Sequence, residues 1–296
     1  MLSALLLVAV MLAAGALLAR TGVFSDAAAD VINRFVVYVS LPALVLHVVP
    51  KLEWRPELAL LVLVPWVTLL IAALVIIGAA RASQWPRPVV GALLLCAPLG
   101  NTSFLGFPLI AALRGTEAVH YAVIYDQLGS FLALSTYGLF VLAKFSGDVA
   151  PTFAMMVKRV ALFPPFIALV LALSPLTLPD ALDPVLARIG DTLSPLAMFA
   201  VGLRLRLRPP PERSALAFGL GVKMLLVPTC ALAIVRALGA SDLPADVAVL
   251  EAAMPPMLSA AALASMAGLA PELCASLAGY GIVVAFVLVP LLSAAL

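Results

Sequence analysis

The stretch "PLGNTSFLGFP", residues 98–108, interrupts a long apolar run of the chain. Pro98 lacks a backbone N–H and Gly100 is a poor helix former, so a regular helix is not expected to continue through this point. Three polar residues follow whose side chains can bond to the backbone groups that the interruption frees: Asn101, Thr102 and Ser103. We therefore predict a broken helix here, with polar side chains at the break.

The composition of the whole chain is that of a membrane protein. Of the 296 residues, 65% are hydrophobic and 11% are charged, and the mean hydropathy is +1.19. Soluble domains carry roughly a quarter charged residues, so a soluble enzyme, a secreted module and a nucleic-acid binder are excluded. The net charge of +2 is too small to indicate a polyanionic partner. The expected environment is a lipid bilayer.

The number of membrane crossings follows from the lengths of the apolar runs. A spanning helix needs roughly 20 mostly apolar residues, and cuts at clusters of charge, Pro and Gly give ten such segments. They cover about residues 2–19, 31–49, 58–80, 89–113, 118–143, 155–174, 185–203, 214–237, 244–267 and 273–294. We therefore expect an all-α membrane protein with ten transmembrane helices.

A second break occurs at a related position in the chain. The ninth segment contains "EAAMPPMLSA", in which Pro255 and Pro256 together remove two helical hydrogen bonds. Pro255 follows Asn101 by 154 positions, and Pro195 in the seventh segment follows Pro42 in the second by 153. Because five spans per half invert the second half, we expect residues 1–150 and 151–296 to form two inverted repeats, as in secondary transporters. Prolines also commonly do no more than kink membrane helices, and that alternative stays open.

If the two breaks meet near the membrane midplane, two half-helix N-termini point at one spot. Each N-terminus acts as roughly half a positive charge, so the spot suits an anion. The predicted substrate-binding residues are Asn101, Thr102, Ser103, Pro255, Pro256 and Ser259. The predicted crossover and hinge residues are Pro98, Gly100, Pro42 and Pro195.

Four segments of the chain resemble one known family. They are "NRFVVYVSLPALVLHVV" (33–49), "GNTSFLGFPLI" (100–110), "LSPLAMFAVGLRL" (193–205) and "EAAMPPMLSAAALA" (251–264). In this order and spacing they are similar to the auxin efflux carrier family, which includes plant auxin exporters and bacterial permeases proposed for malonate, malate and related acids. Related folds are found in sodium/proton antiporters and bile-acid symporters.

The resemblance implies ten helices with external termini, a scaffold domain and a transport domain. It also implies that the fourth and ninth helices cross and move past the scaffold like an elevator, and that related folds dimerise through the scaffold. Plant members carry Asn-Pro-Asn at the first crossing, where this chain has Gly100-Asn101-Thr102. The long cytoplasmic loop of many plant members is also absent from the sequence.

Four further polar residues lie inside predicted spans, where an ionisable group indicates function by default. They are Asp126, Gln127, Lys223 and Glu251. Asp126 is expected either to carry a coupling proton or to form a buried pair. Lys223 is expected either to bind a substrate carboxylate or to neutralise Asp126. Glu251 is expected either to bind a proton or cation at the crossing or to face water in the external mouth. His47 and His120, near external ends, are interpreted as interfacial residues.

The basic residues predict the orientation of the chain. Of the 17 Lys and Arg, five lie on the side that holds both termini, eleven lie on the other side, and Lys223 lies within a span. Cytoplasmic loops are the richer in basic residues. Both termini are therefore expected outside.

The expected function is transport of a small organic anion by alternating access, with export as the default direction. We expect electrogenic, sodium-independent movement of a carboxylate, with Asp126 as the candidate for added proton coupling. A sodium- or proton-coupled symporter or antiporter of the same architecture is the alternative. An intramembrane enzyme would need paired aspartates, a Ser–His pair or a metal-binding His motif, and none appears at a workable depth in the predicted spans. A channel would need a polar stripe along several spans, which the sequence also lacks. No cofactor or metal is expected.

Overall fold

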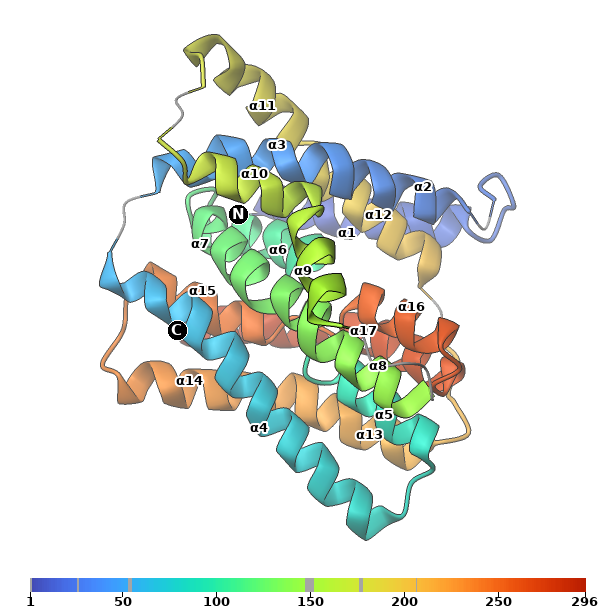
Figure 1. Cartoon of the computed structure of the whole chain (residues 1–296). Coiled ribbons are helices and arrows are strands. Elements are labelled where there is room, and N and C mark those ends of the chain that lie inside the picture. The colour runs from blue at the N-terminus through green and yellow to red at the C-terminus, as the bar shows by residue number, and fades with distance from the viewer. Residues whose placement is uncertain (1, 26, 53–54, 147–151, 176–177, 206) are drawn as a thin grey trace. The chain divides into compact units, whose positions relative to one another are not determined.

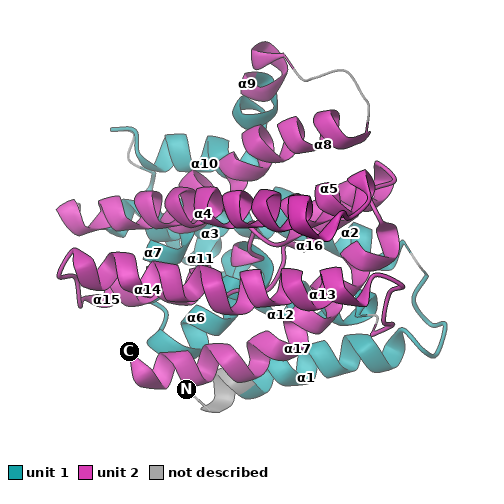
Figure 2. Ribbon diagram, turned by 90° about the horizontal axis from the view of Figure 1, so that it is seen from below, with its two compact units in different colours: residues 1–55, 103–123, 158–205 teal, residues 56–102, 124–157, 206–296 magenta. Residues whose placement is uncertain are grey.

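The computed structural model describes residues 2–25, 27–52, 55–146, 152–175, 178–205 and 207–296. These residues form helices and connecting turns without a β-strand (Figure 1), which confirms the predicted all-α class. The chain divides into two compact units, shown in Figure 2. Unit 1 comprises Met1–Arg55, Ser103–Val123 and Lys158–Leu205, and unit 2 comprises Pro56–Thr102, Ile124–Val157 and Arg206–Leu296.

Unit 1 is built from helices of both halves of the sequence. Its elements are α1 (Leu2–Leu18), α2 (Ala28–Phe35), η1 (Val36–Ser40), α3 (Leu41–Val48), η2 (Val49–Lys51), α6 (Phe107–Arg114), α10 (Pro164–Ala172), η7 (Asp180–Leu182), α11 (Asp183–Gly190) and α12 (Leu193–Arg204). Two further helices cross the boundary between the units: α7 (Ala118–Tyr125) and α9 (Phe153–Ala161).

Close packing of α1 against α12 forms the tightest contact in unit 1. A Cβ atom added at Gly15 would lie 2.2 Å from the carbonyl oxygen of Phe199, and one added at Gly202 would lie 2.2 Å from that of Leu12. Small residues of this kind allow membrane helices to approach backbone to backbone. These two glycines are therefore needed because no side chain fits between the helices.

Unit 2 contains the longest helices. Its elements are η3 (Pro56–Leu58), α4 (Ala59–Ser83), α5 (Arg87–Cys96), η5 (Asp126–Phe131), η6 (Leu134–Gly138), α8 (Leu139–Ser146), α13 (Arg213–Gly221), η8 (Val222–Leu226), α14 (Val227–Ala237), α15 (Leu243–Ala252), α16 (Leu258–Met266) and α17 (Pro271–Ala295). The remaining element, η4 (Thr102–Gly106), begins at the last residue of a unit 2 segment.

Helix α4 packs against η5, α14 and α15 and positions the polar residues of unit 2. A Cβ atom at Gly129 would lie 2.5 Å from Cγ of Pro65, so α4 and η5 touch at these two residues. The indole N–H of Trp66 donates to the carbonyl oxygen of Leu128 at 3.0 Å. These contacts fix η5, which carries Asp126 and Gln127, relative to α4.

Three π-helical turns have a common cause in the sequence. The turns η1, η4 and η8 each end two residues before a proline: Pro42, Pro108 and Pro228. A proline inside a helix has no N–H to donate, and its ring clashes with the carbonyl four residues earlier. A wider turn ahead of the proline relieves that clash, and such turns are frequent at functional sites.

The long apolar helices fit a membrane protein. Among the described residues, six helices are long and apolar enough to span a membrane, and a seventh span results if α9 and α10, bent by 69°, are counted together. The expected fourth and ninth segments are not among them because the chain unwinds at residues 97–101 and 253–257. The count of ten spans therefore stays a prediction.

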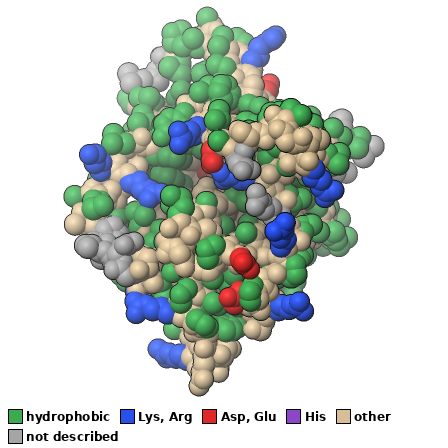
Figure 3. Space-filling model, turned by 90° about the vertical axis from the view of Figure 1, so that its right-hand side faces the viewer, with side chains coloured by type: hydrophobic (Ala, Val, Ile, Leu, Met, Phe, Trp, Pro, Cys, Tyr) green, Lys and Arg blue, Asp and Glu red, His purple; other side chains and the backbone are tan. Residues whose placement is uncertain are grey.

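The surface carries many apolar side chains, as a lipid-facing protein requires. On α4, Leu70 and Leu74 are 58% and 69% exposed. Hydrophobic side chains spread over the face shown in Figure 3, and Lys and Arg side chains are scattered around it.

Candidate substrate-binding site

The two broken helices meet within unit 2 through their unwound backbones. The N–H of Asn101 donates to the carbonyl oxygen of Pro255 at 2.8 Å, and the N–H of Met257 donates to that of Leu99 at 2.9 Å. Gly100 and Pro256 thereby form one antiparallel bridge. Unwound backbone inside a membrane must find partners in the protein, and here each break supplies them to the other.

Helix α17 packs directly against this crossing. A Cβ atom at Gly281 would lie 2.4 Å from Cδ of Pro256, so the second proline of the pair rests directly on the backbone of α17. Helix α16 starts at Leu258, one residue after the last crossing hydrogen bond. Its first N–H groups, which lack partners within the helix, therefore begin at the crossing.

Lys223 places a positive charge beside the crossing. Its side chain is 2% exposed, and its ammonium donates to the carbonyl oxygen of Ala252 at 3.1 Å. Ala252 is the last residue of α15, so the ammonium caps the negative end of a half-helix. A Cβ atom at Gly100 would lie 3.0 Å from the Lys223 nitrogen. Gly100 therefore leaves the space that the ammonium occupies.

A second group of polar residues lies next to the first break. The hydroxyl of Thr102 donates to one carboxylate oxygen of Asp126 at 2.5 Å, and the amide nitrogen of Gln127 donates to the other at 2.7 Å. All three side chains are buried. Both oxygens of Asp126 thus accept a hydrogen bond, which stabilises an ionised carboxylate.

Two buried side chains at the crossing keep unused hydrogen-bonding atoms. Within the described ranges of the chain, the side-chain nitrogen of Asn101 has no hydrogen-bond partner, and neither do the two carboxyl oxygens of Glu251. Asn101 is 1% exposed and Glu251 is 0% exposed. Most buried polar atoms in proteins are paired, so these atoms are candidates for contacts with a ligand.

A small polar cavity of about 10 Å³ lies among these groups, which is room for about one water molecule. It is lined from the first break by Pro98, Gly100 and Thr102, and from facing helices by Lys223 and Glu251. Its other lining residues are Pro65, Thr68, Leu69, Leu99, Tyr125, Gly129, Ser130, Ala133 and Val227. All of them belong to unit 2.

The predicted site residues fall into two sets. Unit 2 brings together Pro98, Gly100, Asn101, Thr102, Asp126, Gln127, Lys223, Glu251, Pro255 and Pro256. Ser259 also belongs to unit 2, but its side chain is exposed on α16. Ser103 is half-buried and begins a segment of unit 1. The alternative in which Glu251 faces water is wrong, because this side chain is completely buried.

The hinge residues Pro42 and Pro195 belong to unit 1. Pro195 is the third residue of α12, where proline is tolerated, and the helix is interrupted before it at residues 191–192. At this place the hydroxyl of Ser40 lies 2.7 Å from that of Thr192. The interruptions of the second and seventh segments thus meet in unit 1, as those of the fourth and ninth meet in unit 2.

Sequence reasoning missed Ser40, Thr192, Tyr125 and Ser130. The spacing did contain a signal for the first two, since Ser40 and Thr192 stand two and three residues before Pro42 and Pro195. Tyr125 and Ser130 carry no such signal. Their place beside the cavity depends on how η5 packs on α4.

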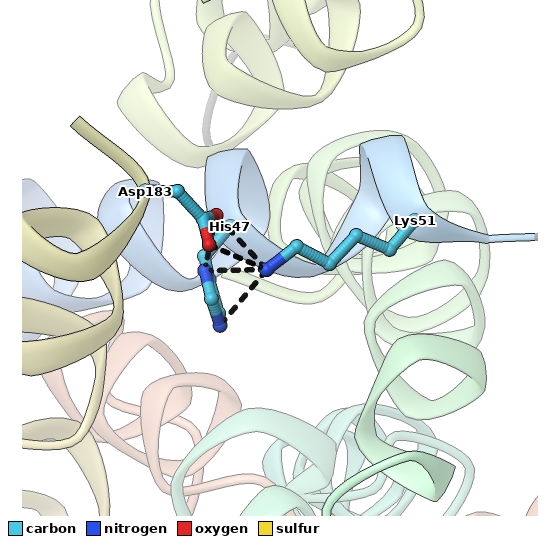
Figure 4. Close-up of polar contacts among 3 residues, drawn as sticks. All are labelled: His47, Lys51 and Asp183. Carbon is cyan, nitrogen blue, oxygen red and sulfur yellow. Dashed lines mark hydrogen bonds and ion pairs between the residues drawn. The ribbon is translucent and has the colours of Figure 1, made fainter. Parts of the chain in front are cut away.

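A separate ion-pair cluster lies in unit 1 (Figure 4). The ammonium of Lys51 lies 2.9 Å from a carboxylate oxygen of Asp183, and Nδ1 of His47 lies 2.7 Å from it. The cluster joins α3 and η2 to α11 and is partly exposed, with 24% to 47% of each side chain accessible. It is an interhelical contact at the surface.

The structure also bears on metal binding. In the part of the chain that the structure describes, no three His, Cys, Asp or Glu side chains are grouped closely enough to hold a metal ion.

Crossed broken helices with buried polar groups define a membrane transporter, and comparison with known proteins agrees. The profile of the family described as "Membrane transport protein" matches residues 1–293, so the chain belongs to this family, which is the auxin efflux carrier family. An uncharacterized transporter of Methanothermobacter thermautotrophicus is 29% identical to it over 98% of this chain and 96% of its own length. Another, from Methanocaldococcus jannaschii, is 23% identical over 86% of this chain and 85% of its own length.

Proposed function

We propose that the protein is a secondary carrier that moves a small organic anion, with a carboxylate as its recognised group. One observation carries the proposal: two broken helices cross beside a buried ammonium, and an amide nitrogen at the crossing has no partner. Lys223 supplies the charge, Asn101 supplies a directed donor, and the first N–H groups of α16 add the positive end of a helix dipole.

The two units support an alternating-access mechanism of the elevator type. In this proposal unit 2 is the transport domain, because it contains both breaks and the buried polar cluster. Unit 1 is the scaffold, because close glycine contacts hold its helices together. A homodimer would form through unit 1.

The proposed topology has ten spans in two inverted halves, residues 1–150 and 151–296, with both termini outside the plasma (bacterial inner) membrane. The meeting of repeat-related segments supports this topology: Ser40 with Thr192 in unit 1, and Asn101 with Pro255 in unit 2. A reporter fused after Leu296 should be active only on the external side. Activity on the cytoplasmic side would reject the orientation.

The direction proposed for transport is export. An anion that leaves a cell with an inside-negative potential gains about 2.3 kcal/mol per charge for each 100 mV. A carrier with anion affinity at midplane therefore needs no coupling ion to export. Coupling to a proton or to sodium is the alternative within the same architecture.

The first test is a thermal-shift screen of the purified protein against mono- and dicarboxylates, since a ligand that binds the folded state raises its stability. The selected carboxylate is then used for transport in proteoliposomes. Asn101→Ala should lower transport by roughly tenfold, the effect of about one hydrogen bond to a charged ligand. Ser259→Ala should have a smaller effect because that side chain is exposed.

The same two substitutions, Asn to Ala and Ser to Ala, are made at other positions as controls: Asn33→Ala and Ser265→Ala. Asn33 lies in α2 of unit 1, and Ser265 lies in the last turn of α16. Both should transport like the unmodified protein. If no carboxylate stabilises the protein, or if Asn101→Ala transports normally at equal expression, the proposed site is wrong.

A further inference from the structure

The buried charges at the crossing are unequally supplied with hydrogen bonds. Asp126 accepts from Thr102 and Gln127, so its ionised form is stabilised. Glu251 is equally buried, yet neither of its carboxyl oxygens has a partner. An ionised carboxylate buried without donors is strongly destabilised, whereas a protonated carboxyl group at the same place carries no charge.

The surroundings of Glu251 contain one positive charge and few other titratable groups. Among the described residues, the groups that interact with it electrostatically are Lys223 on η8, Asp126 on η5 and Tyr125 at the end of α7. Helices α4 and α14 line the shared cavity with residues that do not titrate: Pro65, Thr68, Leu69 and Val227. Lys223 is therefore the one cation in the described part of this cluster.

Lys223 cannot fully neutralise two carboxylates at once. Its ammonium has three donors, of which Ala252 takes one. The remaining donors can serve the substrate carboxylate or an ionised Glu251. Because Asp126 is already bonded to Thr102 and Gln127, an anion bound to Lys223 leaves Glu251 without a counter-charge.

We propose that Glu251 is a proton-binding site whose proton accompanies the anion. This inference rests on the proposed carrier function, and it selects the proton-coupled alternative over uncoupled transport. A proton from water on one side binds a carboxyl oxygen of Glu251 when the anion binds Lys223, and both leave on the other side. The structure, in which neither carboxyl oxygen of Glu251 has a hydrogen-bond partner among the described residues, corresponds to the protonated form of this site. After the anion and the proton have left, the remaining donors of Lys223 are free to serve an ionised Glu251. The candidate for the coupling residue thus moves from Asp126 to Glu251.

The proton site can be tested without a substrate. Infrared spectra of the reconstituted full chain are recorded from about pH 5 to about pH 9, and the carbonyl stretch of a protonated buried carboxyl group is followed. We expect a band that is stronger at lower pH, is absent from Glu251→Gln and is kept in Glu272→Gln, an exposed glutamate at the start of α17. Identical spectra of the unmodified protein and Glu251→Gln would overturn the proposal.

Coupling is tested with malonate and succinate gradients across proteoliposomes that contain a pH-sensitive dye, with the membrane potential clamped and empty liposomes subtracted. In the unmodified protein we expect protons to move with the anion, and apparent affinity to fall about tenfold per pH unit once Glu251 is ionised, as expected for one linked proton. Glu251→Gln, a permanent mimic of the protonated form, should move the anion without protons and with little dependence on pH.

The two proposals fail in different ways. If neither dianion binds or moves in the unmodified protein, transport of these dicarboxylates is rejected, while the infrared titration still decides whether Glu251 holds a proton. If the anion moves without protons in both proteins, the carrier function stands and proton coupling is rejected. Thermal unfolding of Glu251→Gln confirms that the variant is folded, and Glu272→Gln should match the unmodified protein throughout.

Discussion

The two units use a lysine and a carboxylate in opposite ways. In unit 1, Lys51 and Asp183 are roughly half exposed and directly bonded, and they join two helices. In unit 2, Lys223 and Glu251 are buried, and the carboxyl group has no hydrogen bond. Exposed pairs contribute little to stability, whereas buried unpaired groups are costly. Polar groups kept in the costly arrangement are therefore the better indicators of a function.

The largest difference between the units should appear when each lysine is removed. Lys223→Met should reduce binding of the carboxylate selected by the thermal-shift screen by roughly ten- to hundredfold, the effect of losing a hydrogen bond to a charged group. Lys51→Met should leave binding unchanged, because its partner Asp183 belongs to the surface cluster. Binding is measured by titration of the purified proteins. If both variants lost binding equally, Lys223 would have no special role in carboxylate binding.

The next effect concerns stability. Gly202→Ala places a methyl group where a Cβ atom lies 2.2 Å from the backbone of α1, so α1 and α12 must separate. Overpacking of this kind costs about 1–3 kcal/mol. The measurement is thermal unfolding in detergent, followed by circular dichroism.

Gly78→Ala is the matched control for this prediction, because a Cβ atom there has nothing within 4 Å. It should be neutral or stabilise α4 by up to about 1 kcal/mol through helix propensity. If Gly202→Ala were as stable as this control, α1 and α12 would not be packed backbone to backbone.

Substitution of a glycine at the crossing should weaken substrate binding and leave the stability of the fold unchanged. In Gly100→Ala the new methyl group lies 3.0 Å from the Lys223 nitrogen, which is the far end of a flexible side chain. We expect the ammonium to shift, binding to weaken severalfold and the fold to persist. Gly190→Ala meets the backbone of Leu44 at 3.1 Å and should instead lower the melting temperature. The prediction is contradicted if Gly100→Ala lowers the melting temperature and Gly190→Ala weakens binding.

The smallest effect is expected at the surface cluster. Asp183→Asn removes the charge that faces Lys51 and His47, but this aspartate is exposed. The melting temperature should change little at low salt and not at all at high salt, because salt screens exposed pairs. A large, salt-independent loss of stability would show that the cluster holds unit 1 together.

The sequence predicted the elements of the site better than their pairing. Runs of apolar residues gave the helical class, and Pro98, Gly100, Pro255 and Pro256 gave the positions of both breaks. Local chemistry decides these features, since proline cannot donate a hydrogen bond wherever it stands. It was also sufficient to select Asp126, Lys223 and Glu251 as polar residues within apolar segments.

What the sequence could not supply was which polar atoms are satisfied. Asp126 and Glu251 are both single carboxylates in apolar runs, and only packing shows that the first has two donors and the second has none. The same holds for Gly100, which was expected to weaken a helix and in fact leaves space for an ammonium. Thr102 and Asp126 are 24 positions apart, and Gly100 and Lys223 belong to different halves of the chain, so neither contact can be read from local sequence.

The π-helical turn around Lys223 has a consequence for the lengths of related chains. A π-turn holds what amounts to one inserted residue, and each residue advances an α-helix by about 100°. Deleting one residue of Val222–Leu226 would therefore remove the wider turn and rotate the side chains on one side by that angle, while the ring of Pro228 would again clash with the preceding turn. A relative that is one residue shorter here would present a different side chain to the crossing, even if its lysine still aligned with Lys223.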